Sequence, residues 1–284
     1  MIATLAEKSK TLTNHLLDHR NVYPKFSFKE AETVKESKQA QNLRYKIFKN
    51  ELNVKTNLKG KIIKREFDEY DKNATHIIVK AKSTPLSMEK VVGVYRVIKY
   101  TSTDQLNDCY TSKSMCFDLE LFKKNINYSN FLELGRTCIL PEYRKSGVLK
   151  LLWKGLYKYI QKEKIDILLG CASFWTIEPD DVTSQLSYLK QNHLMDKNIM
   201  VIPDSNIKPS IDKLSVCKMY DSYDLHGMES KVFKSLPSLI KAYISVGSKF
   251  GDGAVIDYDF RSIDVFTYVD IHNIDDRVKK YYAK

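Results

Sequence analysis

The chain has 284 residues, of which 43% are apolar, and it carries a formal net charge of +11. This composition suits a folded protein with one sizeable core and excludes a disordered chain or a coiled coil. No run of about 18 apolar residues occurs, and the N-terminus lacks the apolar segment and cleavage site of a signal peptide, so we expect a soluble intracellular protein.

The five cysteines are odd in number, far apart, and never form a C-x-x-C pair. A disulfide framework and a zinc site are therefore not favoured. The six histidines do not cluster in ligand spacing either. We expect no metal in the catalytic chemistry.

The positive charge is concentrated near the N-terminus. Residues 1–65 hold fifteen Lys or Arg against six Asp or Glu. Such an excess attracts polyanions, whether an acidic protein, an anionic membrane surface or nucleic acid, although solvated lysine-rich helix faces give the same excess. Because no aromatic and basic platform with the spacing of a nucleic-acid motif is present, nucleic acid is not favoured.

The first half of the chain reads as a strand, a helix and two further strands. Residues 23–33 suit a strand, and 35–52 suit an amphipathic helix with Leu43, Ile47 and Phe48 on its apolar face. Residues 74–82 and 91–101 read as two strands joined by a turn that contains Pro85.

The next stretch, LELGRTCILPEYRKSGVLKLLWKGLYKYI at 132–160, opens as a strand, turns between Pro141 and Gly147, and continues as a helix. A strand at 166–174 and a helix at 178–194 follow. Residues 236–271 predict a helix, a glycine-bearing turn and a final strand. The order β, α, β, β, β, α, β, α, β is that of a mixed α/β protein with hairpins and crossovers.

This element order resembles the GNAT acyltransferase fold, a largely antiparallel twisted sheet flanked by helices with a bulged fourth strand. GNAT proteins carry R/Q-x-x-G-x-G/A after that strand, where the loop holds the pyrophosphate of acyl-coenzyme A. Here Arg144, Lys145 and Gly147 match this loop and are the expected donor-binding residues, but Leu149 replaces the last small residue. A bulky side chain there crowds a close backbone approach, which disfavours coenzyme A as the donor.

A more specific resemblance is to the ornithine-lipid N-acyltransferase family, which is itself similar to the acyl-homoserine lactone synthases. It rests on short motifs that occur in the family's order between residues 40 and 270: LRYKIF, EFDEYD, VVGVYRV, MCFDLE, LELGRTCILPEYR, LLWKGLYKYI, LLGCASF, LSYLKQNHL and GDGAVIDYDF. The tryptophan that the lactone synthases keep after the first helix is absent, which favours the ornithine-lipid branch.

The resemblance implies transfer of a fatty acyl chain, usually 3-hydroxylated, from the 4'-phosphopantetheine thioester of acyl carrier protein to the α-amino group of ornithine. The product is a lyso-ornithine lipid, and no cofactor is bound permanently. An acidic carrier protein fits the basic N-terminal quarter, and a lipid product fits an enzyme that works at the inner face of the bacterial membrane. The domains expected are a basic extension at 1–22 and one GNAT-like domain at 23–284, with a C-terminal extension from about residue 200.

The same resemblance implies the residues of the site. The positions that match the family's shared pattern are Arg44, Phe48, Asp68, Asp71, Arg96, Glu133 and Arg136. Arg44 and Arg96 are expected to hold the carboxylate of the amino acid, and Asp68 and Asp71 its cationic amines.

Glu133 has two interpretations, which the sequence leaves open. It is either the base that takes the proton of the attacking amine, directly or through water, or a structural partner of Arg136 or Arg96. Because side chains alternate along a strand, Glu133 and Arg136 share a face only if the strand is interrupted. Gly135 lies between them, so we predict a bulge between Glu133 and Cys138, whose backbone also stabilises the oxyanion.

Other residues have weaker assignments. Ser173 leaves the strand at 166–174 and is expected to contact the thioester or the pantetheine arm. Cys138 and Cys171 lie in apolar strands and are expected to be buried structural thiols. Two other functions stay open: acylation of another amine, such as glycine or the substrate of a lactone synthase, and a binding module that kept the fold without the chemistry.

Overall fold

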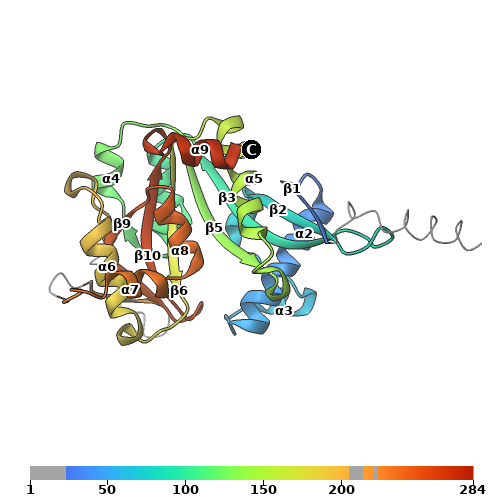
Figure 1. The fold of residues 1–284 in the computed structure, drawn as a ribbon, viewed down its shortest axis with the longest axis horizontal. Helices are drawn as coiled ribbons and strands as arrows, with labels where there is room; N and C mark the ends of the chain where they lie inside the picture. The colour runs from blue at the N-terminus through green and yellow to red at the C-terminus, as the bar shows by residue number, and fades with distance from the viewer. Residues whose placement is uncertain (1–23, 205–213, 220–222, 284) are drawn as a thin grey trace, which may run out of the picture.

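The computed structural model describes residues 24–204, 214–219 and 223–283 of the chain (Figure 1). The predicted N-terminal extension at 1–22 lies outside the described residues. Among the described residues, no helix is both long and apolar enough to cross a membrane.

Eight strands form one twisted sheet in the order β1-β2-β3-β5-β6-β10-β9-β8. Every neighbouring pair is antiparallel except β5 and β6, which are parallel. This confirms the predicted mixed, largely antiparallel α/β fold. The strands are β1 (Lys25–Glu30), β2 (Thr75–Lys82), β3 (Lys90–Tyr100), β5 (Phe131–Ile139), β6 (Ile167–Phe174), β8 (Leu214–Cys217), β9 (Lys249–Asp257) and β10 (Ser262–Asp270). A small second sheet pairs β4 (Phe117–Asp118) with β7 (Ile202–Pro203).

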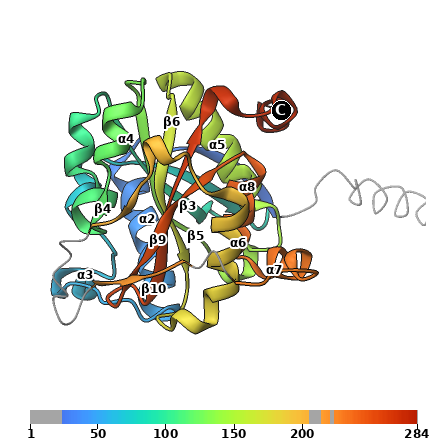
Figure 2. The same cartoon turned by 90° about the vertical axis from the view of Figure 1, so that its left-hand side faces the viewer.

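Helices cover the sheet and complete the core. They are α2 (Val34–Arg44), α3 (Leu58–Ile63), α4 (Glu120–Asn125), α5 (Val148–Glu163), α6 (Thr183–His193), α7 (Glu229–Ser235), α8 (Ser238–Ser245) and α9 (Asp276–Ala283). α2 and α5 lie with the N-terminal strands, whereas α6, α7 and α8 lie with the C-terminal ones (Figures 1 and 2).

α5 packs closely on the N-terminal half of the sheet. A Cβ added to Gly93 of β3 would lie 2.6 Å from Val148, and one added to Gly155 would lie 2.6 Å from Ile77 of β2. Both glycines therefore allow the helix and the strands to approach. β3 is buried from Val91 to Ile98, as expected of a strand covered on both faces.

β5 and β6 separate after a short stretch of pairing. The parallel register joins Phe131–Leu134 to Ile167–Gly170 and goes no further, although both strands continue. At this point Gly170 has φ +155°, and a Cβ there would lie 2.4 Å from the carbonyl oxygen of Leu134. Beyond it the two strands diverge (Figure 1), so backbone and side chains on both become available to a ligand.

The predicted bulge in β5 is confirmed. Gly135 pairs with Arg96, whereas Cys138 pairs with Val94, so two residues on β5 face one on β3. The residue with left-handed backbone is Arg136, at φ +52°, and not Gly135. This conformation is unfavourable for a residue with a Cβ by roughly 1 kcal/mol or more, a cost typical of functional sites.

The glycine-bearing turn predicted in the C-terminal part is present at Gly247, which follows α8 with φ +85°. Strand β9, which comes next, was not predicted. Gly251 and Gly253 lie inside strand β9. A Cβ on Gly251 would lie 2.5 Å from the carbonyl oxygen of Val201, and one on Gly253 would lie 2.9 Å from Pro203. Gly251 allows the segment before β7 to lie against β9, and Gly253 allows β7 itself to do so. Neither glycine makes a turn.

Candidate active site

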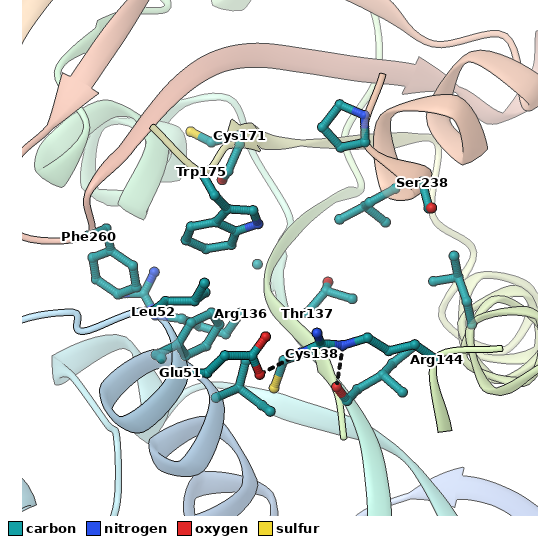
Figure 3. A pocket seen from close by; sticks show the side chains of 18 of the residues that line it. Glu51, Leu52, Arg136, Thr137, Cys138, Arg144, Cys171, Trp175, Ser238 and Phe260 are labelled. Carbon is teal, nitrogen blue, oxygen red and sulfur yellow. Dashed lines mark hydrogen bonds and ion pairs between the residues drawn. The ribbon is translucent and has the colours of Figure 1, made fainter. Parts of the chain in front are cut away.

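A cavity of about 400 Å³ lies where β5 and β6 separate. Its walls come from β5, β6, α8 and the π-helical turn η1 (Tyr45–Glu51) that follows α2. Trp175, Phe260, Arg136 and Thr137 border the open space, with Ser238 across from them (Figure 3). Apolar side chains and a strip of interrupted backbone line the same cavity, which suits an acyl thioester.

The bulge turns Arg136 toward a group of buried charges. Arg96 lies opposite Gly135 in the register, and Glu133 lies opposite Ile98, so these positions share one face of the sheet. Because the bulge inserts one residue, Arg136 joins this face, although regular alternation would place it on the other. The predicted sharing of a face by Glu133 and Arg136 is therefore confirmed.

Six of these charges form what we call the charged ring. Around the ring, arginines and carboxylates alternate in the order Arg44, Glu66, Arg136, Asp68, Arg96 and Asp71. Three cations face three anions, so the ring is neutral as a whole. Sequence reasoning expected four of these residues to hold a substrate, and the structure brings them together but pairs them with one another.

Two arginines link most of the ring. Arg44 donates from Nε to Glu66 at 2.5 Å, and from Nη1 and Nη2 to Asp71 at 2.6 and 3.0 Å. Arg136 donates from Nε to Glu66 at 3.2 Å and from Nη2 to Asp68 at 3.0 Å. Both side chains are buried or nearly so, where two-point pairing with carboxylates is strongest.

Arg96 closes the ring. Its Nη1 donates to Asp68 at 2.6 Å and reaches Asp71 at 3.4 Å. His76 of β2 lies opposite Arg96 in the strand register. Its Nε2 is 3.0 Å from Nη1 of Arg44 and 3.3 Å from Oδ1 of Asp71. Asp68, with 22% of its side chain exposed, is the ring member most open to solvent.

The pKa values in the ring favour fixed charges. Burial opposes ionisation of Asp71, but His76 and Arg44 outweigh it and hold the pKa of this carboxyl far below its usual range. Burial also opposes the charge on Arg44, whose pKa is nevertheless raised by Glu66 and Asp71. The pKa of His76 is lowered, first by burial and then by Arg44, so its imidazole is neutral at pH 7.

Arg136 connects the charged ring with the cavity. Its guanidinium carbon lies 4.6 Å from the ring centre of Tyr110 and 4.2 Å from that of Phe260, and it lines the cavity. Burial opposes its charge, but Tyr110, Glu66 and Asp68 raise its pKa well above the ordinary value. A permanent cation is thus held between two aromatic faces beside the acyl site.

Glu133 has partners that sequence reasoning did not anticipate. Its carboxylate accepts hydrogen bonds from the hydroxyl of Tyr100 at 3.0 Å, the backbone N–H of Tyr110 at 3.1 Å, and the backbone N–H and hydroxyl of Thr111, both at 2.7 Å. It does not line the cavity. Of the two interpretations left open, the structural pairing with Arg136 or Arg96 is therefore wrong, because the π-helical turn η4 (Tyr110–Ser114) supplies donors to both oxygens. Its role as a base stays a prediction.

Phe48 and the loop before α5 border the cavity in part. Phe48 lines it and packs against Phe260 and Trp175, with ring centres 5.7 and 6.1 Å away. Arg144 also lines it, and donates to Glu51 at 2.7 Å and to the carbonyl of Ile139 at 3.2 Å (Figure 3).

Of the other residues of this loop, Lys145 and Gly147 do not line the cavity, whereas Leu149 does. Gly147 has φ +82° and precedes the first turn of α5, so a glycine suits this position. Leu149, which stands where the GNAT loop has a small residue, thus takes up space in the wall of the cavity.

Sequence reasoning missed an acidic group on the other side of the cavity. Ser173 lines the cavity, and its hydroxyl donates to Asp264 of β10 at 2.5 Å. Ser262 donates to the other oxygen of the same carboxylate at 2.7 Å. The sequence feature that could have indicated this group is Asp264 itself, a charged residue in the otherwise apolar stretch IDVF. Glu66, also missed, is the first residue of the EFDEYD motif.

The thiols and phenols near the cavity are kept neutral by burial. Burial raises the pKa of both Cys138 and Cys171, in agreement with the expected structural thiols. Tyr243 lines the cavity and hydrogen-bonds the hydroxyl of Tyr95, and burial raises the pKa of both phenols, that of Tyr95 to about 12.

The splayed sheet, the bulged β5 and the cavity between β5 and β6 define an acyltransferase of the GNAT class. In agreement, residues 43–154 match the family model described as "Acetyltransferase (GNAT) domain". The chain is 31% identical over 249 residues to the L-ornithine N(alpha)-acyltransferase of Agrobacterium fabrum, covering 86% of this chain and 80% of that one. It is also 31% identical to the protein of the same name from Rhizobium meliloti, covering 86% and 79%. The chain belongs to the L-ornithine N(alpha)-acyltransferase family.

Two solved structures align with lower similarity. An N-acyl amino acid synthase from uncultured soil microbes gives a TM-score of 0.47 at 7% identity, covering 88% of this chain and 93% of that chain. A CoA-dependent acyl-homoserine lactone synthase with SAM and isopentyl-CoA gives a TM-score of 0.44 at 13% identity, covering 91% and 88%.

Proposed function

We propose that the protein transfers a fatty acyl chain, 3-hydroxylated in the usual substrate, from acyl carrier protein to the α-amino group of ornithine and so makes a lyso-ornithine lipid. The observation that carries the proposal is the position of Arg136, which borders the acyl cavity and also belongs to the charged ring. One site for an apolar thioester thereby adjoins one site for an amino acid. The names of the relatives, L-ornithine N(alpha)-acyltransferases, support ornithine as the acceptor.

The acyl donor enters between β5 and β6. The pantetheine thioester lies along the interrupted strand, where Arg136 and Thr137 have no partner in the β3 register and β6 has separated. Backbone N–H groups of this bulge then stabilise the oxyanion. Trp175, Phe260 and Leu239 line the same cavity and suit the apolar chain. The 3-hydroxyl and the chain length are properties of the donor, to be measured.

The donor is carried by a protein. Arg144 and Lys145 lie on the exposed loop before α5, where they suit the phosphate of phosphopantetheine and an acidic carrier surface, and Gly147 gives the loop its turn. Leu149 takes up space that a coenzyme A pyrophosphate would need. Phosphopantetheine on a carrier protein has no adenosine diphosphate, so it tolerates this replacement.

The acceptor binds by exchanging partners in the charged ring. Its carboxylate takes over donors of Arg44 and Arg96, and its two ammonium groups meet Asp68 and Asp71. Phe48 completes the wall between this site and the cavity. Asp68 and Asp71 also line a second cavity of about 450 Å³, which gives an amino acid access to the ring. Ornithine carries one net positive charge, so an exchange that engages both acids favours it over an amino acid with a neutral side chain.

The enzyme works in the cytoplasm, at the inner face of the membrane. α3 exposes Leu58 and Ile62, at 74% and 76%, one turn apart on a helix that also carries exposed Lys59 and Lys61. Apolar side chains among lysines suit an anionic lipid surface, to which each cation contributes about 1 kcal/mol. A lipid product is released most readily at such a surface.

The test is an acceptor panel with purified full-length protein. Acyl carrier protein charged with a 3-hydroxy fatty acid is incubated with ornithine, lysine, glycine and S-adenosylmethionine, and products are identified by mass. We expect acyl-ornithine as the main product, and a much slower reaction when acyl-coenzyme A replaces the carrier.

Three outcomes would overturn parts of this proposal. Acylation of glycine in preference to ornithine contradicts the acceptor, and a lactone from S-adenosylmethionine identifies a signal synthase. No product with any donor and amine, from protein that is folded by circular dichroism, identifies a binding module that kept the fold only. The variant that tests the role of Arg136 is Arg136→Met, which keeps an unbranched apolar stem, removes the guanidinium and is expected to abolish product.

A further inference from the structure

Asp264 is a buried carboxylate whose only direct hydrogen-bond partners among the described side chains are two serines. It lies on β10 opposite Ser173 of β6 in the antiparallel register, and 4% of it is exposed. Ser173 donates to Oδ1 at 2.5 Å and Ser262 to Oδ2 at 2.7 Å. Arg136, whose charge also acts on Asp264, directs its own ion pairs to Glu66 and Asp68.

This environment adjusts the acid for proton exchange near neutral pH. Burial raises its pKa to about 7, although the hydroxyls of Ser173 and Ser262 lower it in part. The charged and titratable groups around it act in both directions: Asp257 of β9 raises its pKa, whereas Arg136 of β5 lowers it. Burial, followed by Asp264, raises the pKa of Cys171 on β6, and burial, followed by Asp257 and Asp264, raises that of Tyr110 on η4, so both of these stay protonated.

Ser173 is the route from this carboxylate to the cavity. It lines the cavity together with Arg136 and Thr137, at the place proposed for the thioester, whereas Asp264 itself is not in the lining. A hydroxyl that faces a reaction site and donates to a buried carboxylate has the geometry of an activated proton acceptor. A buried carboxylate that is hydrogen-bonded only by serines lowers stability when it is charged. A residue with a purely structural role would not need to be a carboxylate at this position.

The other candidate acceptors are less suitably placed. Glu51 lines the cavity, but its carboxylate is bound to Arg144. Glu133 is outside the lining, and its oxygens accept four hydrogen bonds, which fill the lone-pair positions that a carboxylate offers. Of the cavity-lining residues, Ser173 therefore has the most direct connection to a base.

We propose that Ser173 and Asp264 form a relay that accepts the proton which the acceptor amine loses during acyl transfer. The proposal deepens the proposed function, since it rests on an amine attacking a thioester in this cavity. Ser173 touches the reacting amine, and Asp264 acts through it as the positioning residue and final proton acceptor.

The step balances without a further reactant. The α-ammonium group first releases one proton to water and turns from the charged ring toward the cavity. The neutral amine nitrogen then attacks the thioester carbon, a C–N bond forms, and the N–H proton passes to Oγ of Ser173 while the serine's own proton moves to Oδ1 of Asp264. When the tetrahedral intermediate collapses, the C–S bond breaks and the departing sulfur takes up the proton by the reverse path. The products are an amide and a free thiol, and Asp264 returns as a carboxylate.

The test compares three substitutions in the full-length protein, with whichever donor and amine the wild type acylates. Ser173→Val removes the hydroxyl and leaves no room for a replacement water, and Asp264→Asn keeps the shape but cannot accept the proton. We expect kcat to fall by about 10²-fold or more in both, with both KM values within about threefold, as for loss of a general base. In wild type, kcat/KM rises with pH through a limb near pH 7, and Asp264→Asn lacks that limb.

The matched control is Ser262→Ala, which removes the donor on the side away from the cavity. Because this hydroxyl stabilises the charged carboxylate, its loss is expected to move the limb to higher pH while kcat stays within about fivefold. If Asp264→Asn does not fold, Ser173→Val decides on its own. A Ser173→Val enzyme with kcat within about threefold of wild type, or an Asp264→Asn enzyme that keeps the limb, overturns the relay. These results leave the proposed function intact, whereas a wild type that acylates no amine contradicts both.

Discussion

The guanidinium of Arg136 and the carboxylate of Asp68 lie 3.0 Å apart, although 68 positions separate them in the chain. The contact exists because the bulge in β5 brings Arg136 onto the face of the sheet that carries Arg96, and because Asp68 begins the short turn before β2. Asp68 is thereby shared between two arginines from neighbouring strands. The strained backbone at Arg136 accompanies the position of this residue between the charged ring and the cavity.

Removing Arg136 is expected to cost far more stability than removing an exposed arginine. In Arg136→Met, Glu66 and Asp68 lose a buried partner, and we expect a loss of about 3–5 kcal/mol in the free energy of unfolding. In the control Arg144→Met, the lost pair with Glu51 is largely exposed, and we expect less than about 1 kcal/mol. Urea unfolding of both variants measures the difference, and equal losses would show that the ring adds no buried pairing.

Asp68 is expected to distinguish ornithine from an analogue without the side-chain amine. In Asp68→Asn, an ammonium group of ornithine loses its anionic partner, whereas norvaline has no charge there to lose. The ratio of kcat/KM for ornithine to that for norvaline should fall by about tenfold, or 1.4 kcal/mol. The control is Asp104→Asn, an exposed aspartate outside the ring and outside both cavities, which should leave the ratio unchanged. An unaltered ratio in Asp68→Asn places the side-chain amine elsewhere.

Asp264 makes stability depend on pH in a direction opposite to that of most aspartates. Burial raises its pKa from 3.8 to about 7, so between these values the folded protein holds a proton that the unfolded chain has lost. Its contribution to stability is therefore present below about pH 4 and is lost as the pH rises through 7. Relative to Asp264→Asn, wild type should lose a few kcal/mol of unfolding free energy from pH 4 to pH 8.

Urea unfolding at several pH values measures this difference. The control is Asp104→Asn, an exposed residue on the turn after β3, for which the difference from wild type should stay flat. A flat difference for Asp264→Asn as well would mean that its carboxylate titrates normally, and would remove the support that this acid gives to the relay.

The sequence predicts six of the eight strands of the sheet, all but β8 and β9, together with helices α2, α5, α6 and α8, because the apolar pattern of these segments is clear. The bulge was also predictable, since two charges three residues apart can share one face only across an irregularity. The position of its left-handed residue was not: Gly135 is the obvious candidate, yet Arg136 takes the conformation because its side chain is held by Glu66, Asp68 and two aromatic rings. Tertiary contacts there outweigh backbone preference.

The charged ring shows a similar limit. The motif positions identify five of its six members, all but Glu66. Which carboxylate pairs with which arginine depends on the turn before β2 and on β5 together, and no local pattern encodes that. The partners of Glu133 were hidden for the same reason. They come from η4, in a segment between β3 and β5 without a clear apolar period, so the sequence gives no indication that its N–H groups face the strand.

Glu133→Gln is expected to act through structure and not through proton transfer. A glutamine side chain presents an amide NH₂ where one oxygen accepted two hydrogen bonds. Either the two donors of Thr111, or those of Tyr100 and Tyr110, then lose their acceptor. We expect a loss of about 2–4 kcal/mol of unfolding free energy, and lower activity because Tyr110 no longer positions Arg136. The pH limb of kcat/KM should stay in place.

The control is Glu142→Gln, which removes an exposed pair with Lys90 and should change neither stability nor activity appreciably. A Glu133→Gln enzyme that unfolds like wild type but lacks the pH limb returns the role of base to Glu133, as the sequence first suggested, and contradicts the relay.

The exposed face of α3 is expected to hold the enzyme at anionic lipid. Leu58→Ser with Ile62→Ser removes two side chains that are about three-quarters exposed, so the fold should be unaffected. Binding to phosphatidylglycerol vesicles, measured by sedimentation, should weaken about tenfold or more, since each apolar side chain that enters the interface contributes on the order of 1 kcal/mol. The control replaces Leu86 and Met88 by serine, which are exposed in the turn between β2 and β3 and lie outside α3. Equal weakening in both double variants, or none in the first, would show that α3 is not the surface that meets the membrane. Phosphatidylcholine vesicles should bind neither protein appreciably, because the lysines of α3 gain nothing at a neutral surface.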